Sequence, residues 1–244
     1  MNVIIYAAGR GTRLGGLTEI IPKALLIVAG KPLIEYALAR AARFNPKLII
    51  IVVGYQADAV KRVVGDSYQG VFIRYVFNGQ YMCAGNMTSL WAAREFCKED
   101  TMLTTSDMIC VRSDVDCIAD APAQNKILID RSPQHFNDPE PVKVALKERR
   151  VIEVRKRDFT GDVGGVAIGV YCFGALAMSE LIVLIGERVR VGTVNASLYY
   201  AINDVCRSQK ITPIYTESDN WFDIDTPEEL IRADRQVSTH KASY

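Results

Sequence analysis

Short apolar runs alternate with stretches of helical periodicity over the first part of the chain. The runs at residues 2–6 and 47–53 are β-branched and almost uniformly apolar, as expected for strands that are buried on both faces. Between them, residues 31–44 place apolar side chains at helical spacing, with Pro32 near the first turn. This alternation predicts a sheet with helices on its faces.

The same pattern continues to the end of the chain. It predicts further strands at 71–77, 101–108 and 211–216, and helices at 86–97, 196–206 and 226–237. The last helix begins with Thr226 as its cap, Pro227 in its first turn and Glu229 three residues after the cap, which is a capping box. The residues that follow it, 238–244, are predicted to be frayed.

Residues 126–172 show a different pattern. Strand-like segments at 126–130, 141–147, 150–156 and 164–173 are separated by turns, with little helix between them. We therefore expect an α/β fold: one domain over residues 1–236 with a doubly wound, Rossmann-like mixed sheet, a small antiparallel extension, and a C-terminal tail at 237–244.

One apolar stretch, residues 163–186, is long enough to span a bilayer. Several glycines lie in its first half, and Ser179 and Glu180 interrupt it, so we predict a buried strand followed by a core helix. The first residues also lack the basic and apolar regions of a signal peptide.

Composition narrows the function classes. The chain has 49% hydrophobic residues and a formal net charge of +1, which argues against disorder and against a general affinity for nucleic acid. The cysteines form no CxxC pair and show no metal-type spacing, and we interpret them as reduced thiols in a cytoplasmic protein. They are Cys83, Cys97, Cys110, Cys117, Cys172 and Cys206. Whether the protein is a monomer or a homodimer stays open.

The segment "AAGRGTRLGGLTEIIPKALL" directly after the first strand gathers cations in a glycine-rich loop. It lacks the third glycine of a dinucleotide fingerprint, because Leu14 stands there, and it is not a P-loop. Arg10, Arg13 and Lys23, with glycines that let backbone amides approach a polyanion, favour a triphosphate site. The alternative is a solvated loop with scattered charges.

Acidic residues follow later strands. Asp107 comes after the strand "TMLTT", and Asp223 and Asp225 precede the capped helix. Carboxylates at the ends of neighbouring strands can hold Mg²⁺ together with substrate phosphates. Individually they could also be turn residues or acids near a helix N-terminus, but with the cationic loop they predict a nucleotide–metal site.

These segments resemble a known family. "AAGRGTRL", "PKALL" and "GKPLIEYAL" look like the N-terminal signature of the sugar-phosphate nucleotidyltransferases, and "SDM" and "WFDIDTPEEL" resemble the two acidic segments of that family, which has a GT-A-like fold. Within the family, "NMTSLWAA" is most similar to the NxxSL segment of the choline-phosphate and inositol-1-phosphate cytidylyltransferases. The resemblance implies a cytidylyltransferase that joins CMP from CTP to a small phosphate or phosphonate acceptor and releases pyrophosphate.

The resemblance also implies residue roles. Lys23 would bridge the α-phosphate and the acceptor phosphate, Arg13 would hold the leaving pyrophosphate, and Asp107 and Asp225, with Asp223 as an additional ligand, would bind Mg²⁺. The nucleotide would also contact Ala7, Ala8, Gly9, Gly11, Thr12, Asn86 and Ser89. Asn86 has an alternative role as a helix cap, and neither His135 nor His240 is assigned a function.

The sequence says less about which residues would bind the acceptor. Lys143 is a candidate for binding the acceptor phosphate, although an alternating strand could equally turn it to solvent. Tyr171, Tyr199, Tyr200 and Trp221 could form an aromatic cage for a choline head group, or they could be core residues. The sequence does not decide between a polyol and an amine.

Proteins with other functions would carry different sequence motifs. A sugar-1-phosphate uridylyl- or guanylyltransferase stays the main alternative, although "FNGQYMCAGNMTSL" differs from the glutamine-rich, proline-containing segment of the uridylyl enzymes. A metal-dependent glycosyltransferase would ordinarily show a DxD motif where this chain has "SDM". A nucleotide sensor without activity would lose the lysine or the acidic residues, which are all present.

Overall fold

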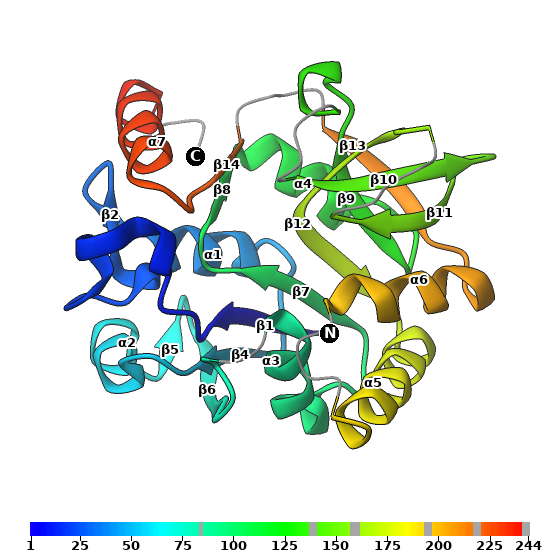
Figure 1. Cartoon of the computed structure of the whole chain (residues 1–244), viewed down its shortest axis with the longest axis horizontal. Coiled ribbons are helices and arrows are strands. Elements are labelled where there is room, and N and C mark those ends of the chain that lie inside the picture. The colour runs from blue at the N-terminus through cyan, green and yellow to red at the C-terminus, as the bar shows by residue number, and fades with distance from the viewer. Residues whose placement is uncertain (83–84, 137–140, 157–161, 193–196, 217–220, 241–244) are drawn as a thin grey trace.

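A ten-stranded mixed sheet forms the centre of the computed structural model (Figure 1), and the strand order along its main path is β11-β10-β12-β7-β1-β4-β6-β5. The structure describes residues 1–82, 85–136, 141–156, 162–192, 197–216 and 221–240. The parallel part of the sheet consists of β1 (Asn2–Ala7), β4 (Leu48–Val53), β6 (Val71–Phe77) and β7 (Thr101–Thr105). β1, β4 and β7 are almost fully buried, as expected for strands with helices on both faces, whereas β6 is partly exposed.

The predicted antiparallel extension is present beside β7. The strand β12 (Gly165–Phe173) pairs antiparallel with β7, with β10 (Val142–Lys147) and with β9 (Lys126–Asp130). The outer partners are β11 (Arg150–Arg155), antiparallel to β10, and β13 (Thr212–Thr216), parallel to β9. The register of β12 against β9 shifts between Ala167 and Tyr171, where Gly169 has a left-handed φ of +83°.

Helices cover the sheet in two layers. The helices α1 (Leu33–Ala42), α2 (Ala57–Val64) and α4 (Arg112–Asp120) pack apolar side chains into one core. The helices α3 (Asn86–Ala92), α5 (Ala175–Arg190) and α6 (Leu198–Ser208) pack into the core on the opposite face. The doubly wound, single-domain fold predicted from the sequence is therefore confirmed.

A third, smaller core joins the loop after β1 to the C-terminal helix α7 (Pro227–Thr239). It also includes the two-stranded pairs β2 (Ile27–Val28) with β3 (Lys31–Pro32), and β8 (Met108–Cys110) with β14 (Trp221–Asp223). Leu14 from the loop and Val237 from α7 are both 1% exposed in this core. The packing holds the loop after β1 and the C-terminal helix together.

Several boundaries differ from those predicted. The strand expected at 101–108 ends at Thr105, and the chain turns at Ser106 and Asp107 before β8 begins. The helix α7 continues to Thr239, beyond the predicted start of the frayed tail, because Val237 extends its buried face. The helices α2 and α4 and the short strand β5 (Ser67–Tyr68) were not predicted.

The apolar stretch at 163–186 forms the strand β12 and most of the helix α5, as expected. Within the described residues, no helix combines the length and the apolar character needed to cross a bilayer. The described cysteines are all free thiols, whereas Cys83, Ala196 and residues 241–244 lie outside the described part of the chain.

The capping box predicted at residue 226 is confirmed, because the Glu229 amide donates to Thr226 Oγ1 and the Thr226 amide donates to Glu229 Oε2. We expect Thr226→Ala to lower the free energy of unfolding by about 1 kcal/mol, the usual contribution of such a cap. Thr239→Ala, at the other end of the same helix, serves as the control and should change it little. Urea denaturation of both variants measures the difference, and equal effects would contradict a specific role for the cap.

Candidate active site

The loop after β1 delivers Lys23 to the edge of the sheet where β1 and β7 end. Gly11 has a left-handed φ of +76°, and a Cβ atom there would lie 2.9 Å from Cβ of Lys23. Only glycine therefore allows the loop to pass so close to the lysine. Lys23 itself begins a single 3₁₀ turn, Lys23–Leu25, in which the Leu26 amide donates to the Lys23 carbonyl at 3.1 Å.

The Lys23 ammonium joins the two predicted acidic segments. Its Nζ atom donates to Asp107 Oδ2 at 2.5 Å and to Asp225 Oδ1 at 2.7 Å, and its side chain is only 8% exposed. Arg13 forms an ion pair with the other oxygen of Asp225. Residues far apart in the sequence thus form one compact charge cluster.

The charges in this cluster change the pKa values of its members. Burial alone would lower the pKa of Lys23, but the carboxylates of Asp107, Asp225 and Asp223 outweigh burial and raise it. Burial alone would raise the pKa of Asp107, and the charge and hydrogen bond of Lys23 outweigh that effect and lower it. Lys23 is therefore cationic and Asp107 anionic at neutral pH.

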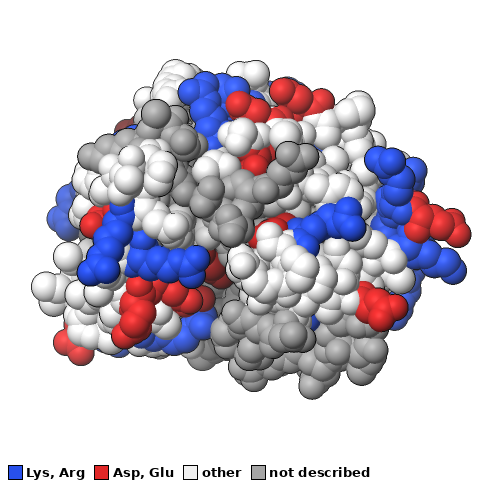
Figure 2. Space-filling view, turned by 90° about the horizontal axis from the view of Figure 1, so that it is seen from above, with Lys and Arg blue, Asp and Glu red and all other residues white. Residues whose placement is uncertain are grey.

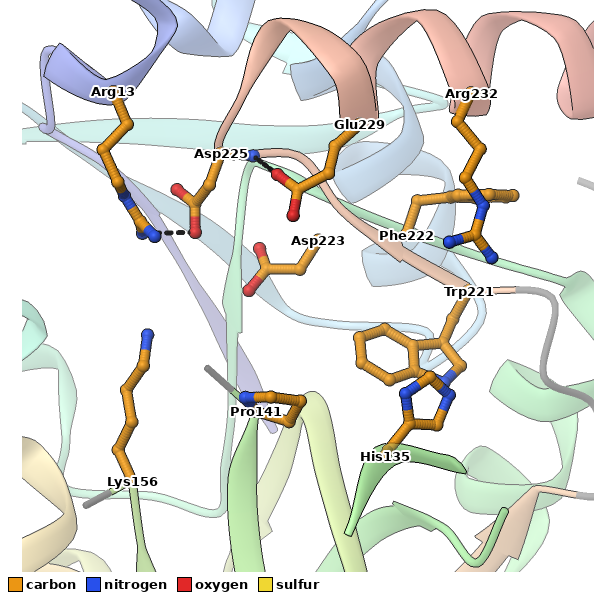
Figure 3. Close-up of a pocket in the computed structure, with 10 residues that line it drawn as sticks. All are labelled: Arg13, His135, Pro141, Lys156, Trp221, Phe222, Asp223, Asp225, Glu229 and Arg232. Atoms are coloured by element: carbon orange, nitrogen blue, oxygen red, sulfur yellow. Dashed lines mark hydrogen bonds and ion pairs between the residues drawn. The ribbon is translucent and has the colours of Figure 1, made fainter. Parts of the chain in front are cut away.

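Asp223 is the acidic residue of the cluster whose pKa is raised. Desolvation first, and then the charges of Asp107 and Asp225, raise its pKa to about 7. Its side chain nevertheless faces the open cleft, where it is exposed to solvent (Figure 3). The charges of Lys23 and Lys156 only partly compensate its negative charge, as expected where a further cation binds.

The helix α7 fixes Asp225 at its N-terminus. Glu229 Oε2 accepts hydrogen bonds from the Asp225 amide at 2.7 Å and the Thr226 amide at 2.8 Å. The capping box that starts the helix therefore also orients the backbone of the acidic residue in front of it (Figure 3).

Two adjoining chambers open on either side of this cluster. The first chamber is lined by residues of β1, its following loop, α3 and the turn after β7: Tyr6, Ala8, Gly9, Lys23, Asn78, Tyr81, Gly85, Asn86, Ser89, Thr105, Ser106 and Asp107. Asn78 is 3% exposed and donates to Ser89 Oγ at 3.1 Å and to Thr88 Oγ1 at 3.2 Å. This network connects the loop after β6 to α3. The N-cap of α3 is Gly85, so Asn86 is not the helix cap and instead faces the chamber.

The second chamber shares Asn86, Thr105 and Asp107 with the first, so the two are continuous. It lies against the antiparallel extension and is further lined by Tyr171, Tyr199, Trp221, Asp223, Asp225, Arg13 and Lys156, among others. Lys156 extends from the end of β11 toward the aspartates in Figure 3. Lys143, which the sequence suggested, lies opposite Arg155 on β10 and is not among the residues that line the described chambers.

A buried carboxylate supports the aromatic wall of the second chamber. Asp130 is 1% exposed, and its Oδ2 atom accepts a hydrogen bond from Trp221 Nε1 at 2.7 Å. The ring of His135 packs 5.2 Å from the indole ring, at a tilt of 50°, and its Nε2 atom lies 3.4 Å from Asp130 Oδ2. Trp221 therefore has a fixed orientation (Figure 3), whereas Tyr200 is 52% exposed and does not line the chamber.

The remaining predicted residues lie around this centre. Ala8 and Gly9 line the first chamber, while Ala7 ends β1 with 4% exposure. Thr12 is exposed at the start of the 3₁₀ segment Thr12–Thr18, and the guanidinium of Arg10 stacks 5.5 Å from the ring of Tyr55.

Sequence reasoning missed Lys156, Asn78, Tyr81 and Arg232, which line the cleft or its outer rim. Lysines and arginines are common on alternating strands and exposed helix faces, so their sequence positions carried no distinctive signal. In the view from above, acidic atoms lie in a hollow with basic side chains on either side of it (Figure 2).

Whether the acidic side chains of the site could bind a metal ion depends on their number and on the atoms that they offer. Within the described residues, no three His, Cys, Asp or Glu side chains are gathered closely enough to hold an ion by themselves. Asp107 and Asp225 do converge on one cation, the Lys23 ammonium, and Asp107 Oδ1 is buried without a hydrogen-bond partner. Hard carboxylate oxygens of this kind fit Mg²⁺ that is also held by substrate phosphates.

Comparison with known proteins identifies the family. Residues 3–166, more than half of the chain, match the MobA-like NTP transferase domain, and the protein belongs to this family.

Two curated relatives illustrate its range. The chain is 31% identical over 131 residues to the CMP-5'-(3-aminopropyl)phosphonate synthase of Streptomyces rubellomurinus, covering 54% of this chain and 21% of the relative. It is 43% identical over 98 residues to the choline-phosphate cytidylyltransferase of Streptococcus pneumoniae, covering 39% of this chain and 40% of the relative. The chain thus matches less than half the length of each.

Solved structures share the fold over nearly the whole chain. The CTP:phosphocholine cytidylyltransferase of Streptococcus pneumoniae superposes with a TM-score of 0.76 at 23% identity, covering 97% of this chain and 98% of the other. At this identity the likeness establishes the fold alone.

The raised pKa of Asp223 gives a stability prediction. Above pH 7 its ionised carboxylate destabilises the folded state, and the penalty disappears as the pH falls from about 7 toward the ordinary value of 3.8. Asp223→Asn should therefore raise the midpoint of thermal unfolding in metal-free buffer at pH 8 and lose this advantage near pH 4.

The control is Asp58→Asn, because the Asp58 side chain is 89% exposed. Thermal scans of both variants at the two pH values measure the effect. A stabilisation by Asp223→Asn that does not change with pH would contradict the electrostatic origin.

Proposed function

We propose that the protein is a cytidylyltransferase that transfers CMP from CTP to a small phosphate or phosphonate acceptor. The observation that carries the proposal is the buried Lys23 ammonium, held between Asp107 and Asp225 at the junction of two chambers. A cation at such a junction can contact both reacting phosphates.

The reaction is a substitution at phosphorus. An acceptor oxygen forms a bond to the α-phosphorus of the nucleotide, the bond from that phosphorus to the bridging oxygen breaks, and its electron pair leaves on pyrophosphate. Because phosphate esters have a second pKa of about 6, the acceptor oxygen is already largely ionised at neutral pH. The protein then contributes alignment and charge neutralisation.

The geometry supports a role for each cation. Lys23 lines the first chamber and donates to Asp107, which lines both chambers, and this supports a role in which its ammonium would contact the α-phosphate and the incoming oxygen. Arg13, at the mouth of the second chamber, would exchange its contact with Asp225 for the leaving pyrophosphate. Lys156 replaces Lys143 as the residue that would hold the acceptor phosphate.

Mg²⁺ would be held by Asp107 and Asp225, with Asp223 as a further ligand. When bound, the ion would neutralise phosphate charge in the transition state. The buried Oδ1 atom of Asp107, which has no hydrogen-bond partner, and the carboxylates of Asp107 and Asp225 beside Asp223 support a cation at this position.

CTP is supported by the segment around α3. Asn86 and Ser89 place polar groups in the first chamber beside Ala8 and Gly9, and the similarity to relatives named for CMP or cytidylyl transfer covers part of the chain. The alternative, a sugar-1-phosphate uridylyltransferase, shares the fold: the UDP-glucose pyrophosphorylase of Acinetobacter baumannii superposes with a TM-score of 0.80 at 17% identity, covering 98% of this chain and 93% of the other.

The acceptor head group would lie against the aromatic wall. Tyr171, Tyr199 and Trp221 line the second chamber, with Asp223 beside them. Aromatic faces near a carboxylate can bind an ammonium head group through cation–π and ionic contacts. This arrangement favours an amine over an uncharged polyol.

The nucleotide prediction is tested by a matrix of pyrophosphate-release assays. CTP should exceed ATP, GTP and UTP by at least about a hundredfold in kcat/KM, because a wrong base leaves buried polar groups unpaired. The acceptors are phosphocholine, 2-aminoethylphosphonate, inositol 1-phosphate and glucose 1-phosphate. A preference for UTP with the sugar phosphate would establish the alternative, and no release from any pair would refute the activity.

Lys23→Ala should abolish release with every pair in that matrix, because its ammonium would contact the reacting phosphates, which all pairs share, and not the variable base or head group. Lys47→Ala is the matched control, since Lys47 is a 69% exposed lysine paired with Glu99 on the surface. Residual activity of Lys23→Ala with only some acceptors would contradict a role at the reacting phosphates.

Activity should require Mg²⁺ or a similar divalent ion. We expect excess chelator to abolish turnover and Asp107→Ala to lower it by at least about a hundredfold, the effect of removing a charge-stabilising group. Asp58→Ala provides the control. Full activity of Asp107→Ala, or turnover in chelator, would exclude this metal assignment.

A further inference from the structure

The turn that carries Asp107 is held by hydrogen bonds from other segments. The Ser106 amide donates to the Tyr6 carbonyl at 3.0 Å, and the Ile224 amide donates to the Asp107 carbonyl at 3.1 Å. These bonds join the turn to β1 and to the segment that follows β14. The carbonyl groups of Thr105 and Met108 lie on either side of Ser106 and Asp107.

Arg40 donates to these carbonyl groups from the helix α1. Its guanidinium donates through Nη2 to the Thr105 carbonyl at 2.8 Å and through Nη1 to the Met108 carbonyl at 3.0 Å. The Nε atom donates to Thr104 Oγ1 at 3.1 Å. One planar, rigid group therefore bridges the two ends of the turn.

Burying the charged guanidinium of Arg40 costs desolvation free energy. The residue is only 3% exposed, and burial lowers its pKa. Among the described residues no carboxylate lies within ion-pair distance of it, and its hydrogen bonds go to carbonyl, hydroxyl and thioether groups. The Cys110 thiol and the charge of Asp107 offset only part of the effect of burial on its pKa. An apolar side chain of similar volume would avoid this desolvation, so packing alone does not explain an arginine here.

We propose that Arg40 is a positioning residue that fixes the Asp107 turn for metal binding and catalysis. The part concerning the metal rests on the proposed function. By holding the carbonyls of Thr105 and Met108, the guanidinium sets the direction in which the Asp107 carboxylate projects toward Lys23. Without it the carboxylate keeps its chemistry but loses its fixed position.

Hydrogen exchange of the metal-free protein tests the positioning directly. In Arg40→Met the amides of Ser106 and Ile224 should exchange faster, while amides in the centre of β4, such as Ile50, should keep their protection. Arg43→Met is the matched control, since Arg43 lies on the same helix but pairs with Asp116 on the surface, at 2.5 Å. It should leave all of these amides unchanged.

Metal binding provides the second readout. Calorimetry with Mn²⁺ in the presence of CTP and without acceptor, and the Mg²⁺ dependence of turnover, should both show an affinity about tenfold or more weaker in Arg40→Met, as for other residues that orient a metal ligand. The KM for the nucleotide at saturating Mg²⁺ should stay close to that of the wild type.

Arg40→Lys distinguishes bridging from charge and serves if Arg40→Met does not fold. A single ammonium cannot span both carbonyls as the planar guanidinium does, so the lysine variant should also show faster exchange at Ser106 and weaker metal binding.

Full restoration by lysine, unchanged exchange in Arg40→Met, or uniformly faster exchange throughout the sheet would each overturn the proposal. Absence of pyrophosphate release with every substrate pair would instead refute the proposed function, because the exchange experiment does not depend on activity.

Discussion

The buried ammonium of Lys23 is the contact on which the arrangement of the site depends. It joins the loop after β1 to Asp107 behind β7 and to Asp225 in front of α7. The Lys23 side chain is only 8% exposed, and burying its charge costs free energy unless the charge is paired. The surrounding elements must therefore place carboxylates next to its ammonium. The third core supports this placement, because Leu14 and Val237 pack the loop and the C-terminal helix together.

The cluster is compact but not electrically balanced. Asp223 adds a third carboxylate, and burial followed by the charges of Asp107 and Asp225 raises its pKa, although Lys23 and Lys156 act in the opposite direction. Proteins commonly concentrate such unfavourable charge where function needs it. Here the charge faces the junction of the two chambers, where a metal ion and phosphates would bring compensating and additional contacts. Stability and the proposed activity therefore place opposite demands on the same carboxylate.

The two chambers divide recognition between different parts of the fold. The first is built from the parallel sheet and α3, whose Asn78–Ser89 hydrogen bond ties two segments of the wall together. The second is built against the antiparallel extension, with Trp221 oriented by the buried Asp130. In the proposed reaction the extension would contribute the acceptor side, while Asp107, Asp225 and Arg13 of the Lys23 cluster line the same chamber. Arg40 supports the centre from behind through backbone carbonyls.

The sequence determined the elements whose signals are local. Uniformly apolar β-branched runs predicted β1 and β4, the capping box predicted the start of α7, and a glycine loop with Arg13 and Lys23 indicated an anion site. It also indicated Asp107, Asp223 and Asp225 as candidate metal ligands. Only the tertiary structure decided which cations face the cleft, since Lys143 lies on β10 opposite Arg155, and Lys156, the residue after Arg155, is the one that lines the second chamber. The role of Arg40 was equally hidden, because its partners are carbonyl groups, which every residue possesses and which no side-chain pattern records.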